Sequence, residues 1–307
     1  MNRRVGDLAA QEFAARLARG RLEVRIGPFD LRVTGRARGL AEPLHVLYRD
    51  YPLLEGERVL HGHVEVRDVL RWLPRPRRAI RFEVDGRAPH EDMPAGQALP
   101  VLEWGINLVI ALRYHCFLML HAAVLERGGR ALLLPAWPGH GKTTLCAALA
   151  HRGWRLLSDE FGLVRPGTRD LVPVPRPMPL KNASIEVIRQ FAPQAFIGPT
   201  IPGTRKGTIA HVRPPAGSVA RAGEPAPAGW IVFPRWQAGA ALTLEAMSRS
   251  EGYMQLATNA FNYEMLGEAG FDTVRDLVGG ARCHRLVYSD LDEAVRALDA
   301  LAGEGPA

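Results

Sequence analysis

Lysine is nearly absent from this chain of 307 residues. It has 39 Lys and Arg residues, but only Lys142, Lys181 and Lys206 are Lys. Arg presents a planar fork of donors, whereas Lys presents a compact ammonium that binds phosphate as a point charge. The three surviving lysines indicate places that need the compact charge. We therefore expect Lys181 and Lys206 to face the same site as Lys142; the alternative is that they are ordinary surface lysines.

Cysteine is scarce, and the basic residues do not form a block. Cys116, Cys146 and Cys283 are widely spaced and odd in number, which excludes a disulfide framework or a zinc spacing. The net charge of +7 comes from scattered Arg, and the densest run, 71–81, is interrupted by Pro as in an exposed loop. Nucleic acid is therefore not an expected partner, whereas nucleotide phosphates suit the charge.

No long uninterrupted apolar run is present either. The segment 104–120 is the most apolar, but Arg113 and His115 lie within it and Glu103 precedes it, so we predict a buried helix over about 99–120 rather than a membrane span. The first residues lack the apolar core of a leader peptide. These absences predict a cytoplasmic protein with no membrane partner. The apolar content of 47 % and charged content of 23 % are typical of a globular protein.

The most informative segment that is present is 136–144, AWPGHGKTT. An apolar run of strand type precedes it and a run of helix formers follows it, which is the order that a phosphate-binding loop requires. We call this segment the candidate phosphate loop. Ala136 stands where the full pattern has Gly. The residues predicted to bind the nucleotide here are Pro138, Gly139, His140, Gly141, Lys142, Thr143 and Thr144.

The chemistry of such a loop predicts ATP and Mg²⁺ as cofactors. Backbone N–H groups and the positive end of the new helix would face the phosphates. Lys142 would reach the β- and γ-phosphates, and Thr143 would hold the magnesium ion.

Two further patterns surround the loop. Gly128-Gly129 joins two apolar runs and predicts a hairpin that leads into the loop, hence a mixed sheet. Downstream, a short strand ends in Asp159-Glu160, where a phosphate-loop enzyme needs its metal partner or its base. Arg205 and Lys206 form a basic turn that could hold a phosphate; an exposed loop is the alternative.

The remaining chain divides by its patterns. Residues 1–95 alternate short strands with turns and predict a small N-terminal α+β module of unassigned role, and residues 96–307 form the nucleotide-binding domain. Asn182 is expected to cap a helix over 183–191, and Asp290 one that ends near Leu301. A helix is also predicted over 251–266.

The residues from about 118 to 165 resemble the HPr kinase/phosphorylase family, in particular its bacterial HPr-kinase-related subfamily. The resemblance is carried by His121, the hairpin, PGHGKTT and HRGWRLLSDE, and continues more loosely through LKNASIEVIRQF and PGTRKGTIAHVRPP. It does not extend over residues 1–95. It implies an α/β fold: a phosphate-loop kinase core with the mixed sheet of phosphoenolpyruvate-carboxykinase-like proteins.

The resemblance also implies roles. Asp159 matches one of the two family Asp residues that include the catalytic base, and Glu160 stands at the other, so either can be the base. His121 matches the family's site His, and Lys142 and Thr143 match its phosphate Lys and a magnesium ligand. Asp159 and Thr143 would bind the metal together with Glu186, on the helix after Asn182. The family's oligomers make a homo-oligomer an expected assembly.

We therefore predict a kinase that transfers the γ-phosphoryl group of ATP to a Ser or Thr hydroxyl of a small protein or peptide. The alternatives are a nucleotide-dependent ATPase switch that acts on a protein partner, and a nucleotide-binding module without chemistry.

Overall fold

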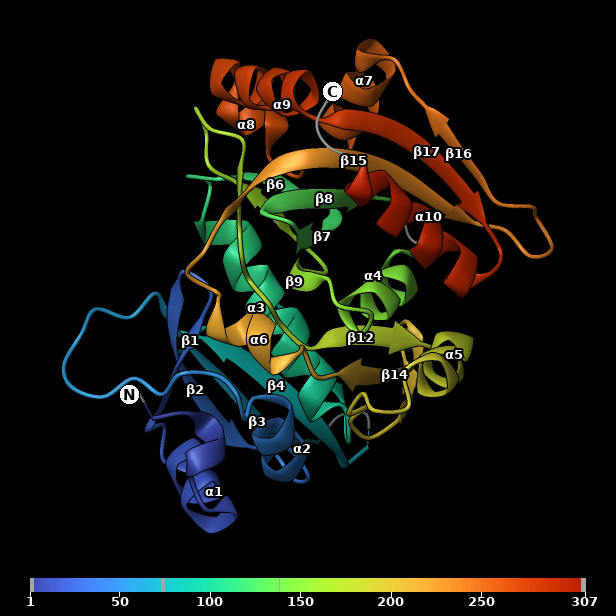
Figure 1. Cartoon of the computed structure of the whole chain (residues 1–307). Coiled ribbons are helices and arrows are strands. Elements are labelled where there is room, and N and C mark those ends of the chain that lie inside the picture. The colour runs from blue at the N-terminus through green and yellow to red at the C-terminus, as the bar shows by residue number, and fades with distance from the viewer. Residues whose placement is uncertain (1–2, 73–74, 138, 305–307) are drawn as a thin grey trace.

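An N-terminal sheet occupies the lower part of the molecule in Figure 1. The computed structural model describes residues 3–72, 75–137 and 139–304. The sheet has the order β1-β2-β3-β4-β5, in which only β2 and β3 are parallel. Its strands are β1 (Leu22–Ile26), β2 (Phe29–Arg36), β3 (Gly62–Arg71), β4 (Arg77–Val84) and β5 (Met93–Pro94), accompanied by η1 (Val5–Asp7), α1 (Ala10–Ala18) and α2 (Ala41–Leu47).

The helix α3 (Ala98–Arg113) packs on this sheet and connects it to the rest of the chain. Gly105 permits the close approach, because a Cβ there would lie 2.1 Å from the Phe82 ring. Because α3 ends at Arg113, the predicted end of this helix near Leu120 was wrong. Leu118–Leu120 is strand β6, which is fully buried and pairs antiparallel with β10 (Gly162–Val164) at the end of the main sheet.

The main sheet is mixed and has the order β6-β10-β11-β15-β8-β7-β9, with β17 beside β15 and β16 beside β17. The predicted hairpin is present: β7 and β8 pair antiparallel, and Gly128 and Gly129 both have positive φ. The mixed α/β class predicted from the sequence is thus confirmed. The further strands are β7 (Ala122–Arg127), β8 (Arg130–Pro135), β9 (Arg155–Ser158), β11 (Asp170–Val172), β15 (Ala226–Trp236), β16 (Thr243–Ala246) and β17 (Arg282–Tyr288).

Both faces of the sheet are covered at its centre, where strands β7 and β8 are almost wholly buried. Alternate residues of β8 face opposite sides: Leu132 and Leu134 pack with α4 (Lys142–Ala150) and α10 (Leu291–Gly303), whereas Ala131 and Leu133 pack with residues of α7 and α9. Figure 1 shows α7, α8 and α9 on one side and α4 and α10 on the other. The covering helices are α7 (Arg249–Thr258), α8 (Tyr263–Leu266) and α9 (Glu268–Gly280).

The predicted helix over 251–266 is thus interrupted. The segment between α7 and α8 instead binds β6, since Phe261 donates its N–H to Met119 and the Asn262 side chain bonds the backbone on both sides of Leu118. Asp290 does cap α10, because its carboxylate accepts the N–H of Glu293.

A smaller sheet lies between the N-terminal sheet and α4. It has the order β12-β14-β13, with β12 (Met178–Lys181), β13 (Ile201–Thr204) and β14 (Gly207–Val212), and it is joined by α5 (Ala183–Phe191) and α6 (Ala216–Ala220). The Asn182 side chain does not cap α5 as predicted; its oxygen accepts the N–H of Thr208, which ties α5 to β14. This sheet carries Lys181 at the end of β12 and Lys206 in the turn between β13 and β14.

Candidate functional site

Strand direction brings the predicted site residues to one edge of the main sheet. β7 runs antiparallel to both β8 and β9, so the start of β7 lies beside the ends of its two neighbours. Ala122 is opposite Pro135, and Val124 is opposite Ser158. His121, the candidate phosphate loop and the Asp159-Glu160 pair therefore share this edge. β15 and β17 run parallel to β8 and also end there.

The loop between β8 and α4 has the backbone that its glycines predict. Gly139 and Gly141 have φ of 90° and 83°, which L-residues rarely adopt. No side chain caps α4, so the N–H groups of its first turn, at Lys142, Thr143 and Thr144, remain available to an anion. His140 is held at both backbone ends: its N–H donates to Trp137 and its carbonyl accepts from Trp236. Pro138 lies outside the described residues.

Two buried groups beside this helix terminus have no hydrogen-bond partner. Lys142 is 8 % exposed and Asp159 is 4 % exposed, yet neither the Lys142 ammonium nor either Asp159 oxygen makes a hydrogen bond among the described residues. Leaving a buried polar group without a hydrogen bond costs on the order of 1–3 kcal/mol, and more when the group is charged. Their arrangement is therefore suited to a ligand that supplies both a negative charge and a cation.

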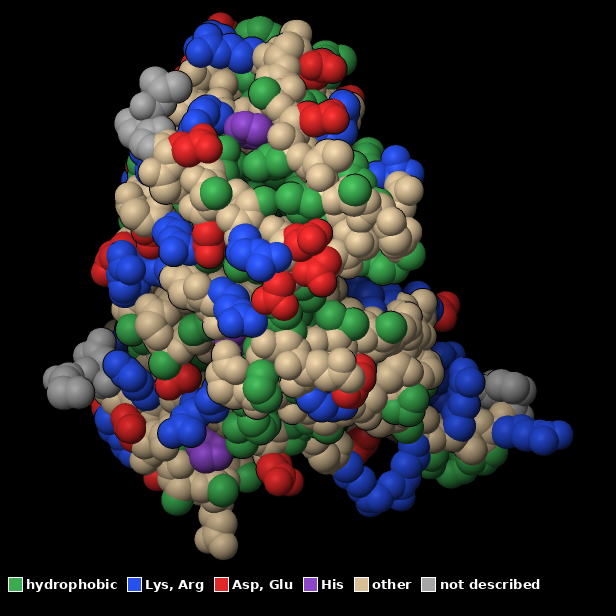
Figure 2. Space-filling view, turned by 45° about the vertical axis from the view of Figure 1, so that its right-hand side comes forward, with side chains coloured by type: hydrophobic (Ala, Val, Ile, Leu, Met, Phe, Trp, Pro, Cys, Tyr) green, Lys and Arg blue, Asp and Glu red, His purple; other side chains and the backbone are tan. Residues whose placement is uncertain are grey.

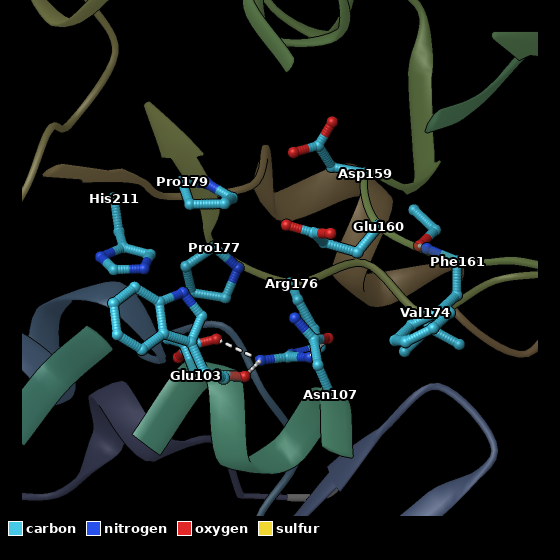
Figure 3. Close-up of a pocket in the computed structure, with 12 residues that line it drawn as sticks. Glu103, Asn107, Asp159, Glu160, Phe161, Val174, Arg176, Pro177, Pro179 and His211 are labelled. Carbon is cyan, nitrogen blue, oxygen red and sulfur yellow. Dashed lines mark hydrogen bonds and ion pairs between the residues drawn. The ribbon is translucent and has the colours of Figure 1, made fainter. Parts of the chain in front are cut away.

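The surroundings shift the pKa values of the two acids, Asp159 and Glu160, in opposite directions. Burial raises the pKa of Asp159 to about 6, with Lys142 opposing and Glu160 reinforcing the shift; the Thr143 hydroxyl is close enough to lower it in part. The pKa of Glu160 moves the other way, because the positive charges around it outweigh its burial. Figure 3 shows the two carboxylates diverging: Glu160 extends toward Pro177, and Asp159 points away from Arg176.

The three lysines surround this pair. The charges of Lys142, Lys206 and Lys181, in that order, lower the pKa of Glu160. Lys206 is exposed in its turn, but partial loss of hydration there lowers its pKa, and Glu160 counteracts that shift. The Lys206 ammonium also lies 5.5 Å above the centre of the Trp104 ring, which orients it from the α3 side. Three positive charges thus face two negative ones.

His121 lies at the same edge in a neutral form. Burial, followed by the charge of Lys142, lowers the pKa of His121 to about 4. Its backbone N–H donates to Asn259, and its ring centre lies 5.6 Å from that of Phe261. Phe261 in turn contacts Phe161, which follows the acidic pair.

The structure adds a group that the sequence did not indicate. A small cavity of about 20 Å³, enough for one water molecule, lies below Glu160. Arg176 is buried there and binds the Glu103 carboxylate and, from the same side, Asn107; Tyr48 donates to Glu103 at 2.7 Å. His211 is fully buried, and neither ring nitrogen has a hydrogen-bond partner in the described part of the chain. These residues are far apart in the sequence, so no local pattern could have identified them.

Two other predicted residues lie apart from this group. The Glu186 carboxylate is exposed and binds Arg189 and Gln190 on its own helix. Arg205 is exposed beside Lys206. Neither is among the groups with the largest effect on the pKa of Asp159 or Glu160, and their roles at the metal and at phosphate stay predictions.

The donor set suits magnesium in one specific way. Within the described residues no three His, Cys, Asp or Glu side chains gather as a metal site. Mg²⁺, however, usually binds through one or two carboxylates together with phosphates and water. The unpartnered oxygens of Asp159 and the nearby hydroxyl of Thr143 fit that mode, in which the nucleotide supplies the other ligands.

None of the described helices is long and apolar enough to cross a membrane. Figure 2 shows Lys and Arg side chains interspersed with Asp and Glu over most of the visible face, and gathered with few acids at its lower right.

Comparisons with known proteins find similar chains among solved structures. No family model matches the chain, and no curated protein matches it. Among solved structures, the chain is similar to the Hpr(Ser) kinase/phosphatase from Coxiella burnetii, with 13 % sequence identity and a TM-score of 0.25. The alignment covers 61 % of this chain and 99 % of the neighbour.

Proposed function

We propose that the protein is an ATP-dependent kinase with a phosphate-loop core of the phosphoenolpyruvate-carboxykinase-like kind. The observation that carries the proposal is the buried, unpartnered pair of Lys142 and Asp159 beside the uncapped start of α4. A bound nucleoside triphosphate with magnesium would give the Lys142 ammonium a negative partner and the Asp159 carboxylate a positive one. A neighbour at 13 % identity and a TM-score of 0.25 supports no assignment of function, so this geometry stands alone.

Each part of the site then has a role. The first-turn N–H groups of α4 and the Lys142 ammonium bind the phosphates, and Asp159 with Thr143 holds magnesium. When bound, the metal neutralises charge that develops on the phosphates. Lys206 and Lys181 add positive charge near Glu160, where the transferred group would lie.

Either acid, Asp159 or Glu160, can accept the proton of the acceptor hydroxyl. Asp159, with its pKa raised to about 6, has the affinity for a proton that a base needs near neutral pH. Metal binding to Asp159 would leave Glu160 as the base, and Glu160 extends into the cavity side of the site. The acceptor is a Ser or Thr hydroxyl on a small protein or peptide. Phe261, 56 % exposed next to His121, offers an apolar contact to such a polypeptide.

The test is transfer of label from γ-labelled ATP with magnesium in the presence of a cell lysate or candidate peptides. We expect label on a second polypeptide with the natural chain and none with Lys142→Ala. Asp159→Asn should reduce transfer by at least ~10²-fold, the usual loss for a general base, while ATP still binds. Asp292→Asn makes the same change on an exposed carboxylate and should leave transfer intact.

The outcomes separate the alternatives. Phosphate release without labelled protein would favour an ATPase switch. Full transfer by Lys142→Ala would exclude the phosphate-loop assignment. If Asp159→Asn transfers normally and Glu160→Gln does not, Glu160 is the base.

A further inference from the structure

Trp236 lies against the candidate phosphate loop with much of its side chain free. It ends β15, and its backbone N–H donates to the carbonyl of His140 at 3.1 Å. Its Cβ lies so near Gly141 that a Cβ on that glycine would be 2.9 Å away. The residue is nevertheless 48 % exposed. It is thus a large aromatic surface fixed beside the loop and open to solvent.

The indole is also anchored through its polar edge. Its Nε1–H donates to the carbonyl of Ser289, which follows β17, at 3.1 Å. With that edge bonded to the backbone, the ring cannot rotate freely, and its remaining surface is apolar. A pre-oriented ring of this kind stacks a ligand with little loss of side-chain entropy.

Strand order places Trp236 opposite the acidic pair. From β8, which leads into the loop, β7 and β9 lie on one side and β15 and β17 on the other. Asp159 and Glu160 follow β9, whereas Trp236 and its register partner Tyr288 end β15 and β17. A nucleotide is a linear ligand with the γ-phosphate at one end and the base at the other. If its reacting end is at Asp159, its base extends toward β15.

We propose that Trp236 is the stacking surface for the nucleobase of the bound nucleotide. This inference rests on the proposed function, because it takes the position of the phosphates from the loop. The indole contributes affinity through ring stacking, which accepts any base and reads no base edge. In this arrangement the nucleobase, rather than the phosphates, lies at the ends of β15 and β17.

Trp137 provides the matched comparison. It is also exposed, at 58 %, and lies in the loop itself. No side-chain hydrogen bond anchors its indole among the described residues, and it precedes the loop's turn rather than flanking α4. A free aromatic side chain pays more entropy to stack on a ligand. Trp137 therefore serves as the control for general loss of a tryptophan near the loop.

The experiment measures binding directly by calorimetry, with Mg–ATP and with Mg–tripolyphosphate, which has the phosphates but no base. We expect Trp236→Ala to weaken ATP binding by at least about fivefold, which is the lower end of the loss for a stacked base. The affinity for tripolyphosphate should not change. Trp236→Phe should bind ATP within about threefold of the natural chain, since a phenyl ring still stacks. Trp137→Ala should lose less ATP affinity than Trp236→Ala, and any loss should be equal for ATP and tripolyphosphate.

The results distinguish three failures. Unchanged ATP binding by Trp236→Ala overturns the inference, and so does an equal loss for both ligands, which would show a structural role. If the natural chain binds neither ligand, the proposed function fails instead.

A measurement on the natural chain covers the case in which Trp236→Ala does not fold. Oxidation by N-bromosuccinimide, read by peptide mass spectrometry, should be slowed at Trp236 by Mg–ATP and not by Mg–tripolyphosphate. Equal oxidation of Trp236 with the two ligands would overturn the inference.

Discussion

At the scale of single residues, the scarcity of lysine predicts a common position that the structure supports. Lys181 ends strand β12 and Lys206 lies in the turn between β13 and β14, yet both act on the pKa of Glu160 together with Lys142. Lysine acetylation read by mass spectrometry has three side-chain targets in this chain. We expect Mg–ATP to protect Lys142 and at least one of the other two, with Lys206 favoured, because phosphate would neutralise and cover the ammonium groups.

The Lys142→Ala variant is the control for this labelling. Without the ammonium that faces the phosphates, ATP should no longer protect Lys206. Equal labelling of Lys181 and Lys206 with and without ATP and acceptor would show that both are ordinary surface lysines, although the candidate phosphate loop would stand on its own.

At the scale of elements, the turn into α4 depends on Gly141. Its φ of 83° disfavours other residues, and a Cβ there would lie 2.6 Å from the Tyr288 hydroxyl and 2.9 Å from Trp236. Gly139 has a similar φ of 90°, but a Cβ there would meet nothing within 4 Å. Gly141→Ala should therefore lower the thermal midpoint more than Gly139→Ala, by at least about 2 °C for the roughly 1–3 kcal/mol cost of overpacking. Equal midpoints would show that backbone strain alone governs both positions.

Local patterns predicted the elements whose causes are local. Gly128-Gly129 specifies the β7–β8 hairpin through positive φ, and Asp290 caps α10 through its own carboxylate. The end of α3 was missed because Leu118–Leu120 is as apolar as the helix before it, and only its pairing with β10 makes it a strand. The Asn182 cap failed for the same reason: a tertiary partner, Thr208, takes the side-chain oxygen.

At the scale of the whole molecule, the site is completed by contacts that span the sequence. Arg176 reaches Glu103 over 73 residues, and Tyr48 reaches Glu103 over 55. Tyr51 donates to the carbonyl of Pro175, so two tyrosines of the N-terminal part hold the wall of the cavity. Trp236 approaches the loop only through strand order. The sequence pointed to the polar groups that gather at the sheet edge, but pairings of this length arise from packing and leave no local signal.

His211, buried in that cavity wall, makes the stability of the fold depend on pH. Burial lowers the pKa of His211 to about 4, with Glu103 opposing and Arg176 reinforcing the shift, against an ordinary value of 6.5. Between these two values the unfolded chain binds a proton at this position and the folded chain does not, so acidification favours unfolding. From pH 7 to pH 5 the loss from His211 should be about 2 kcal/mol.

Urea unfolding of the natural chain and of His211→Gln, at pH 7 and pH 5, measures this contribution. Glutamine has a similar length and does not titrate here, so the variant should lose less stability over the interval, by roughly the same 2 kcal/mol. Other groups, including His121 with its pKa near 4, act alike in both proteins and cancel in the comparison. An identical loss in the two proteins would mean that His211 finds a partner that stabilises its charged form, most simply water in the cavity below Glu160 bridging it to a carboxylate.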